Sequence, residues 1–311
     1  MARLDIVVAA ALVFAMSVHA DPGPEQIAYT ARPAGDLNYE VHVVEASGAD
    51  ERNLTNHPAW DWQPAWSPDG NSLAFTSHRE EPEPGIYLMD VGTRDVRFLA
   101  AGEQATWSPD GSHIAYVEFR DGRTEVFAIN IDGTGRRQVV KDGPRLQWYP
   151  AWSPGGEKIA FHSPLGERRI HVVAAEGGAP APLVQGHAAR SLDWSPGSDA
   201  LLFTGVSKGD PEIFVVDADG RNIRQLTDQL GHDADARWSP DGAAIVFASR
   251  RFPPGIYVMD ADGGDVRMLV EGPYIQPTWS GRRELSVTAP QKRPLSWGWV
   301  KETGGGMGNP R

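Results

Sequence analysis

The sequence predicts an all-β fold, a β-propeller of six four-stranded blades. Three observations predict it. A Trp-Ser pair recurs six times, and successive pairs lie 41 to 45 residues apart. Each pair is followed by a turn and then by short apolar strands. Self-similarity at a period near forty residues is typical of propeller blades. The pairs begin at Trp66, Trp107, Trp152, Trp194, Trp238 and Trp279. Because the repeats run through most of the chain, we expect one large domain.

A Pro-Asp-Gly turn follows the Trp-Ser pair at residues 68–70, 109–111 and 240–242, and altered forms of it follow the other pairs. Proline presets φ, aspartate hydrogen-bonds to the nearby backbone and glycine accepts positive φ, so the motif has the chemistry of a tight turn. We therefore interpret it as closing a hairpin in every unit and not as a catalytic motif.

Two apolar strands are predicted after each turn, as at residues 73–75 and 86–89, and they are apolar at almost every position. Strands that are apolar on both faces must be covered on both faces. Blades packed face to face around an axis provide this cover, whereas the strands of a two-layer sandwich alternate between apolar and polar residues. A glycine-bearing turn and a more polar fourth strand, as at residues 217–227, complete the unit and suit an exposed edge.

The two ends of the repeat region are predicted to share a blade. Residues 27–30, 39–44 and 52–55 resemble the second, third and fourth strands of a blade that lacks its first, and residues 275–280 supply the missing strand. Sharing a blade closes the ring and removes exposed strand edges. Residues 284–288 resemble another second strand, so seven blades remain the alternative.

The first twenty residues read as a signal peptide. Arg3 precedes an apolar run at residues 6–18, and a small-x-small site predicts cleavage after Ala20. An uncleaved anchor is the alternative. We expect a periplasmic or secreted protein without a membrane span in the mature chain. The propeller is predicted to cover residues 21–289, and residues 290–311, which are rich in Gly and Pro, are predicted to be a flexible tail.

Composition excludes several classes of function. The chain has no cysteine, which rules out disulfides, thiolate metal sites and a cysteine nucleophile. Its net charge of −12 disfavours contact with nucleic acid. We expect a monomer with no cofactor and no nucleic-acid partner.

The loops around a propeller's central channel are the expected place for a binding site. The position three residues before each repeat tryptophan is usually polar. This recurrence predicts a ring of polar side chains at the channel mouth. These residues are Gln63, Gln104, Tyr149, Ser191, Asp235 and Gln276. The alternative is that these positions simply face water in the channel.

Aromatic residues in the same loops are candidate anchors for a protein partner, since exposed aromatics are enriched at interfaces. We single out Trp60, Trp62, Trp148 and Tyr149. The alternative is packing between neighbouring loops, because tryptophan is mostly buried in folded proteins.

The segments Pro-Ala-Trp-Ser-Pro-Asp-Gly at 64–70 and Pro-Ala-Trp-Ser-Pro at 150–154 resemble the repeats of the TolB-type β-propeller family. The likeness runs from about residue 26 to 280 and recurs six times. The resemblance implies a propeller that binds envelope proteins, including a peptidoglycan-associated one. It extends to the propeller of such proteins and not to the α/β domain that precedes it in them. The predicted function is therefore an exported, non-enzymatic protein-binding propeller of the cell envelope.

A metal-dependent polysaccharide lyase is the alternative function, because oligogalacturonate lyases are similar in carrying such repeats with a histidine-bound metal at the channel mouth. His57, His187 and His232 are the candidate ligands, although they lie at different distances from their repeat tryptophans. A sensor or scaffold domain is a third alternative. The Gly-x-Ser-x-Gly pattern at 205–209 does not indicate a hydrolase, because a strand follows it and not a helix.

Overall fold

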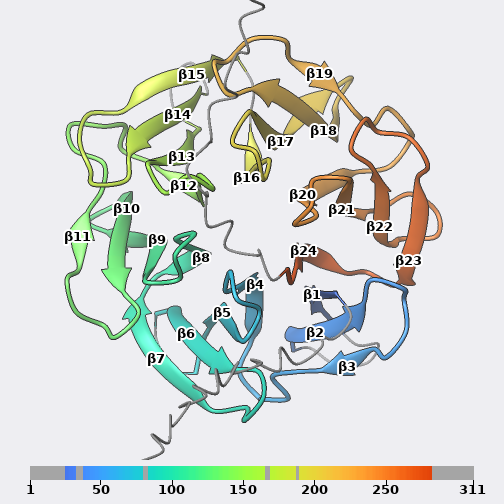
Figure 1. The fold of residues 1–311 in the computed structure, drawn as a ribbon, viewed down its shortest axis with the longest axis horizontal. Coiled ribbons are helices and arrows are strands. Elements are labelled where there is room, and N and C mark those ends of the chain that lie inside the picture. Colours follow the sequence, from blue (N-terminus) through green and yellow to red (C-terminus); the bar gives the residue numbers. More distant parts are fainter. Residues whose placement is uncertain (1–24, 33–37, 80–82, 165–168, 187–188, 282–311) are drawn as a thin grey trace, which may run out of the picture.

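The computed structural model describes residues 25–32, 38–79, 83–164, 169–186 and 189–281. These residues form six four-stranded antiparallel sheets arranged around a central axis, as Figure 1 shows. The described residues contain no helix, and so none that is long and apolar enough to cross a membrane. The predicted six-bladed propeller is confirmed. Residues 1–20, the candidate strand at 284–288 and the predicted tail at 290–311 lie outside the described residues.

Blade 1 is built from both ends of the described chain. It consists of β24 (Ile275–Trp279), β1 (Gln26–Ala31), β2 (Glu40–Glu45) and β3 (Arg52–Asn53). Blades 2 to 6 are each continuous in sequence, and their first strand lies innermost (Figure 1). Blades 2 and 3 consist of β4 (Asp61–Trp66), β5 (Ser72–Ser77), β6 (Gly85–Asp90) and β7 (Val96–Ala101), then β8 (Glu103–Trp107), β9 (His113–Arg120), β10 (Arg123–Asn130) and β11 (Arg137–Gln138).

The remaining three blades follow the same order. Blade 4 consists of β12 (Trp148–Trp152), β13 (Lys158–Ser163), β14 (Arg169–Ala174) and β15 (Ala181–Gln185). Blades 5 and 6 consist of β16 (Arg190–Trp194), β17 (Ala200–Ser207), β18 (Asp210–Asp217) and β19 (Arg224–Gln225), then β20 (Asp233–Trp238), β21 (Ala244–Ser249), β22 (Gly255–Asp260) and β23 (Arg267–Glu271).

The ring closes where β24 pairs with β1. Ile27 lies opposite Trp279 and Ala28 opposite Thr278 in an antiparallel register. The Ser280 N–H donates to the Gln26 carbonyl at 2.6 Å, and the Gln26 N–H donates to Ser280 Oγ at 2.8 Å. The predicted shared blade is therefore confirmed, and its closing strand β24 pairs with β1.

The hydrophobic core lies between successive blades. Leu202 and Ile213 of blade 5, for example, pack with Ile245 and Phe247 of blade 6, and all four side chains are fully buried. Burying such a side chain contributes roughly 1.5–3 kcal/mol. The apolar composition of the middle strands predicted that both of their faces are buried. The two adjacent blades bury them, one on each face.

The hydrogen bonds of the Pro-Asp-Gly turns stay within their own hairpins. Ser67 Oγ donates to Asp69 Oδ1 at 2.5 Å and accepts the Ser72 N–H at 2.9 Å, and the same pair of bonds recurs in blades 3 and 6. These hydroxyl and carboxylate groups therefore close hairpins, as the sequence indicated.

The turn glycines also pack between blades. Gly156 has a φ of +79° and Gly242 one of +74°, which favours glycine. A Cβ on Gly156 would lie 3.4 Å from Pro109, and a Cβ on Gly242 would lie 3.4 Å from Pro196. In both cases the glycine of one turn meets the proline of the preceding blade's turn, so the recurring motif also fixes the spacing of the blades.

Candidate partner-binding face and central channel

The two ends of the propeller differ in their connections. We call one the loop face, because it carries the loops that lead into the innermost strands and the hairpins between second and third strands. We call the other the turn face, because it carries the Pro-Asp-Gly turns and the turns between third and fourth strands. The predicted channel-mouth residues precede their repeat tryptophans on an innermost strand or, for Trp60, directly before one, and so they lie on the side of the loop face.

The six recurring channel positions share an unusual backbone. Each has a positive φ, which is uncommon for residues other than glycine. Each also lies where the pairing of the first and second strands shifts by a bulge, and a bulge re-aims a side chain. The positions and φ angles are Gln63 (55°), Gln104 (61°), Tyr149 (55°), Ser191 (44°), Asp235 (57°) and Gln276 (57°).

Three glutamine side chains link neighbouring blades head to tail. Gln276 Oε1 accepts the Gln63 N–H at 3.2 Å, and Gln63 Oε1 accepts the Gln104 N–H at 3.2 Å. Gln104 Oε1 accepts the Tyr149 N–H at 2.7 Å. The glutamine side chains therefore bind backbone groups of the next blade, which is a structural use in addition to any contact with a partner.

The chain of hydrogen bonds begins at Asp235. Its Oδ2 atom accepts the Gln276 N–H at 3.3 Å, while Thr204 Oγ1 accepts the Asp235 N–H at 3.2 Å. Burial raises the pKa of the Asp235 carboxyl above its usual range, with Arg237 acting in the opposite direction. The ring therefore places one carboxyl on the blade 6 side of the channel and amides on blades 1 to 3.

A central cavity of about 220 Å³ lies inside this ring. The six ring residues line it, together with the repeat tryptophans and the turn prolines. Trp107 Nε1 donates to the Ala65 carbonyl at 2.9 Å and Trp194 Nε1 to the Ala151 carbonyl at 3.2 Å, so these two indoles tie blade 3 to blade 2 and blade 5 to blade 4. The repeat tryptophan thus has a packing role at the axis.

The predicted aromatic anchors occupy two different settings. Trp60 is about half exposed on the loop face and meets the rings of Tyr39 and His78 edge-on, at centroid distances of 5.7 and 6.3 Å. Trp62 lies against His78 at 5.0 Å. Trp148 packs against the buried cluster between blades 3 and 4. Their contact with a partner stays a prediction.

The candidate metal ligands are held by other contacts or lie outside the described residues. His57 Nδ1 accepts the Ala59 N–H at 3.1 Å, and His232 Nε2 lies 3.3 Å from Asp210 Oδ1. His187 is one of the residues that the structure does not describe. Within the described ranges, no group of three or more His, Cys, Asp or Glu side chains could hold a metal ion.

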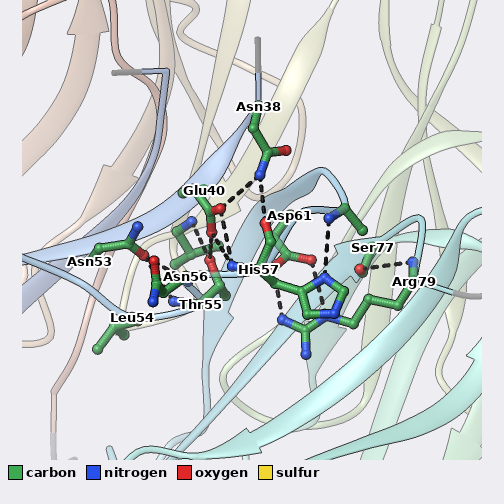
Figure 2. A network of polar contacts seen from close by, with 12 residues as sticks. Asn38, Glu40, Asn53, Leu54, Thr55, Asn56, His57, Asp61, Ser77 and Arg79 are labelled. Carbon is green, nitrogen blue, oxygen red and sulfur yellow. Dashed lines mark hydrogen bonds and ion pairs between the residues drawn. The ribbon is translucent and has the colours of Figure 1, made fainter. Parts of the chain in front are cut away.

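A buried polar network joins blades 1 and 2 on the loop face (Figure 2). The Glu40 carboxylate accepts the Thr55 hydroxyl at 2.5 Å and the His57 N–H at 3.1 Å. Beside it, the fully buried Asp61 carboxylate pairs with Arg79 at 2.8 Å. The Arg79 guanidinium lies over the Phe75 ring at 5.2 Å. The network fixes the loop that carries Trp60.

The same network recurs between blades 5 and 6. Glu212 accepts the Thr227 hydroxyl at 2.5 Å, and the fully buried Asp233 carboxylate accepts the Ser249 hydroxyl at 2.5 Å and pairs with Arg251. The sequence analysis missed this pair of networks. A recurring sequence pattern could have revealed them. In both places a Leu-Thr pair has an aspartate six residues after the threonine, at 55–61 and 227–233, and a Ser-x-Arg segment follows at 77–79 and 249–251.

Glu212 makes stability depend on pH. Burial raises its pKa from 4.5 to about 6, so the folded chain holds this proton more tightly than the unfolded chain. The protonated Glu212 carboxyl contributes about 2 kcal/mol to the free energy of unfolding. This contribution is fully present below pH 4.5 and is lost as the pH rises through 6. We expect Glu212→Gln to flatten the pH dependence of urea unfolding across this window. The exposed Glu157→Gln is the control, and an unchanged slope in Glu212→Gln would contradict the assignment.

Comparison of the sequence with known proteins identifies one family model and several relatives. The model of the TolB beta propeller domain matches residues 184–296. An uncharacterised protein of Agrobacterium fabrum is 24% identical over 269 residues, which cover 78% of this chain and 79% of that protein. A TolB homolog of Chlorobium luteolum is 31% identical over 145 residues, 43% of this chain, and these span 30% of that relative's length.

Solved structures share the fold. TolB from Acinetobacter baumannii matches with a TM-score of 0.72 at 19% identity, over 82% of this chain and 66% of that one. An oligogalacturonate lyase in complex with manganese matches less closely, with a TM-score of 0.52 at 19% identity, over 79% of this chain and 73% of that one. Identities this low show the fold alone.

Proposed function

We propose that the chain, which has the propeller fold and whose repeats are similar to those of TolB-type β-propellers, is an exported, non-enzymatic protein-binding module of the cell envelope. The partner is an envelope protein, such as a peptidoglycan-associated one, and it binds the loop face. Export to the periplasm rests on the leader predicted at residues 1–20, which the structure does not describe. Trp60, Trp62 and the ring residues on the same side of the channel are the proposed contacts nearest the axis.

The observation that carries the proposal is the exposure of large apolar side chains on the loop face. Phe252 is 97% exposed and Leu230 is 90% exposed, and both lie on loops of this face. Phe119, Val206 and Trp60 are also exposed there. Exposed apolar side chains gathered on one face are typical of protein interaction sites. Trp60 is of the residue type that is enriched among the anchors of protein interfaces.

The loops that carry Leu230 and Phe252 lie close together, and the residue next to Phe252 takes part in the buried network of blades 5 and 6. A Cβ on Gly231 would lie 2.6 Å from the Arg251 backbone nitrogen, so the two loops are in close contact. Arg251 in turn pairs with the buried Asp233. Side chains presented on fixed loops lose little conformational entropy on binding, which favours affinity.

We expect the double substitution Leu230→Ser and Phe252→Ser to reduce partner capture from a solubilised envelope fraction at least tenfold, about 1.4 kcal/mol or more. The measurement is a quantitative pull-down with the purified chain, followed by titration of the captured protein. Met268→Ser is the matched control, because Met268 is an exposed apolar residue of blade 6 on the outer strand β23. Equal capture by the double variant would contradict the proposal.

A further inference from the structure

The turn face carries a groove that the proposed partner site does not use. It has a volume of about 630 Å³, within the range of ligand pockets in proteins. It opens from the central channel and follows the turns of blades 2 to 5. The lining includes Pro68, Trp107, Pro109, Ile131, Pro154 and Pro196. The groove therefore has an apolar floor of half-buried proline, tryptophan and isoleucine side chains.

Among the residues that the structure describes, none from blades 6 and 1 lines the groove. Gly281 follows β24 there and packs tightly on the neighbouring turn, since a Cβ on Gly281 would lie 1.8 Å from Pro240 Cγ. The described lining is consequently an arc over the turns of blades 2 to 5. An arc with an apolar floor suits an extended segment of polypeptide better than a compact small molecule.

The rim of this arc is acidic. The Pro-Asp-Gly turns of blades 2 and 3 and the altered turns of blades 4 and 5 each carry one exposed carboxylate, and Lys158 is the one lysine or arginine in these four turns. Asp69 and Asp110 line the groove, and Glu157 and Asp199 lie in the adjoining turns of blades 4 and 5. A hydrogen bond from the Ser108 hydroxyl lowers the pKa of Asp110, so this carboxyl is ionised at neutral pH. A partner segment that enters the groove must therefore tolerate or match negative charge.

The loop face is different in charge. Its hairpins carry basic side chains beside acidic ones, as with Arg120, Asp121 and Arg123 at the β9–β10 hairpin and Lys208 and Asp210 at the β17–β18 hairpin. Electrostatic complementarity governs association rate and partner choice more than raw affinity. The turns that border the groove and the loop-face hairpins should accordingly select partner segments of different charge.

We propose that the turn-face groove binds a cationic segment of a partner protein in which lysine or arginine alternates with large apolar residues. The apolar side chains lie on the proline and tryptophan floor, and the cationic side chains meet the carboxylates of the rim. Aromatic-lined and proline-lined grooves are an established way of binding extended peptides. This site is separate from the loop-face site of the proposed function.

The test uses a fluorescein-labelled heptapeptide of alternating lysine and tryptophan or leucine, measured by fluorescence anisotropy with the full mature chain. Gly155→Arg blocks the groove, because Gly155 lines it and a Cβ there would have nothing within 4 Å. Gly92→Arg is the matched control on the same face, where a Cβ would approach only the exposed Asp90 side chain, at 3.4 Å. Ile131→Lys is a second groove variant in case Gly155→Arg fails to fold.

We expect Gly155→Arg to weaken peptide binding at least tenfold and Gly92→Arg to change it less than threefold. A peptide with glutamate in place of lysine should not bind, and affinity for the cationic peptide should fall as salt is added. Three results would overturn the proposal: no binding to the unmodified chain, equal weakening by the two arginine variants, or weakening by the Leu230→Ser and Phe252→Ser pair. The last result would place the peptide on the loop face.

Discussion

Replacing Asp233 by alanine is expected to lower the free energy of unfolding by about 3–5 kcal/mol. The Asp233 carboxylate is fully buried, and it neutralises Arg251, whose side chain is 16% exposed. Removing the carboxylate leaves the guanidinium without its ionic partner in a site poor in water, and it leaves the Ser249 hydroxyl without its acceptor. The measurement is urea unfolding followed by intrinsic tryptophan fluorescence, with free energies extrapolated to water.

Two variants make this result interpretable. Asp210→Ala removes an exposed carboxylate that pairs with His232, so its expected cost is under about 1 kcal/mol. Adding Arg251→Met to Asp233→Ala removes the buried cation and keeps an apolar side chain on the rings of Phe247 and Tyr257, which should restore part of the loss. A loss below 1 kcal/mol in Asp233→Ala would mean that the pair is dispensable.

Replacing Phe203 by alanine is expected to cost about 3–5 kcal/mol, because it leaves a cavity in a close-packed core. Phe203 is fully buried in the cluster between blades 4 and 5 and stacks on Phe214 at a centroid distance of 5.4 Å. The blades are held together chiefly by such apolar contacts. The substitution should therefore lower the free energy of global unfolding, as measured by equilibrium urea unfolding.

Phe119→Ala is the matched control for this cavity variant, since it removes the same side chain from a position that is 67% exposed. Its expected cost is within about 0.5 kcal/mol, as for most surface substitutions. Similar losses for the two variants would contradict the assignment of Phe203 to the core.

The fold could be predicted from the sequence because the repeat makes local and global signals agree. The spacing of the six tryptophans indicated the number of blades. The strands predicted at 27–55 lacked a first strand, which residues 275–280 could supply. The fourth strands were less predictable. At residues 223–227 a longer strand was expected, but β19 pairs only at Arg224 and Gln225, because pairing at an outer edge depends on contacts that composition does not reveal.

The geometry of the channel could not be predicted from residue types. A polar residue three positions before each tryptophan indicated a ring, but nothing in a glutamine predicts a φ near +55°, which arises from the bulge between two paired strands. The loop-face anchors Leu230 and Phe252 were also missed. Neither repeats from blade to blade, and only the folded backbone brings their two loops together.

The shared first blade has a consequence for how the chain folds. Blades 2 to 6 are contiguous segments of about forty residues and have local contacts, whereas blade 1 joins Ile27 to Trp279, 252 positions apart. Contacts at such a separation slow folding, because a long loop must close before they form. During synthesis on a ribosome, the strands at residues 26–53 therefore remain without their pairing strand until residues 275–279 have been made. Until then the unpaired edge of β1 is open to contact with other chains.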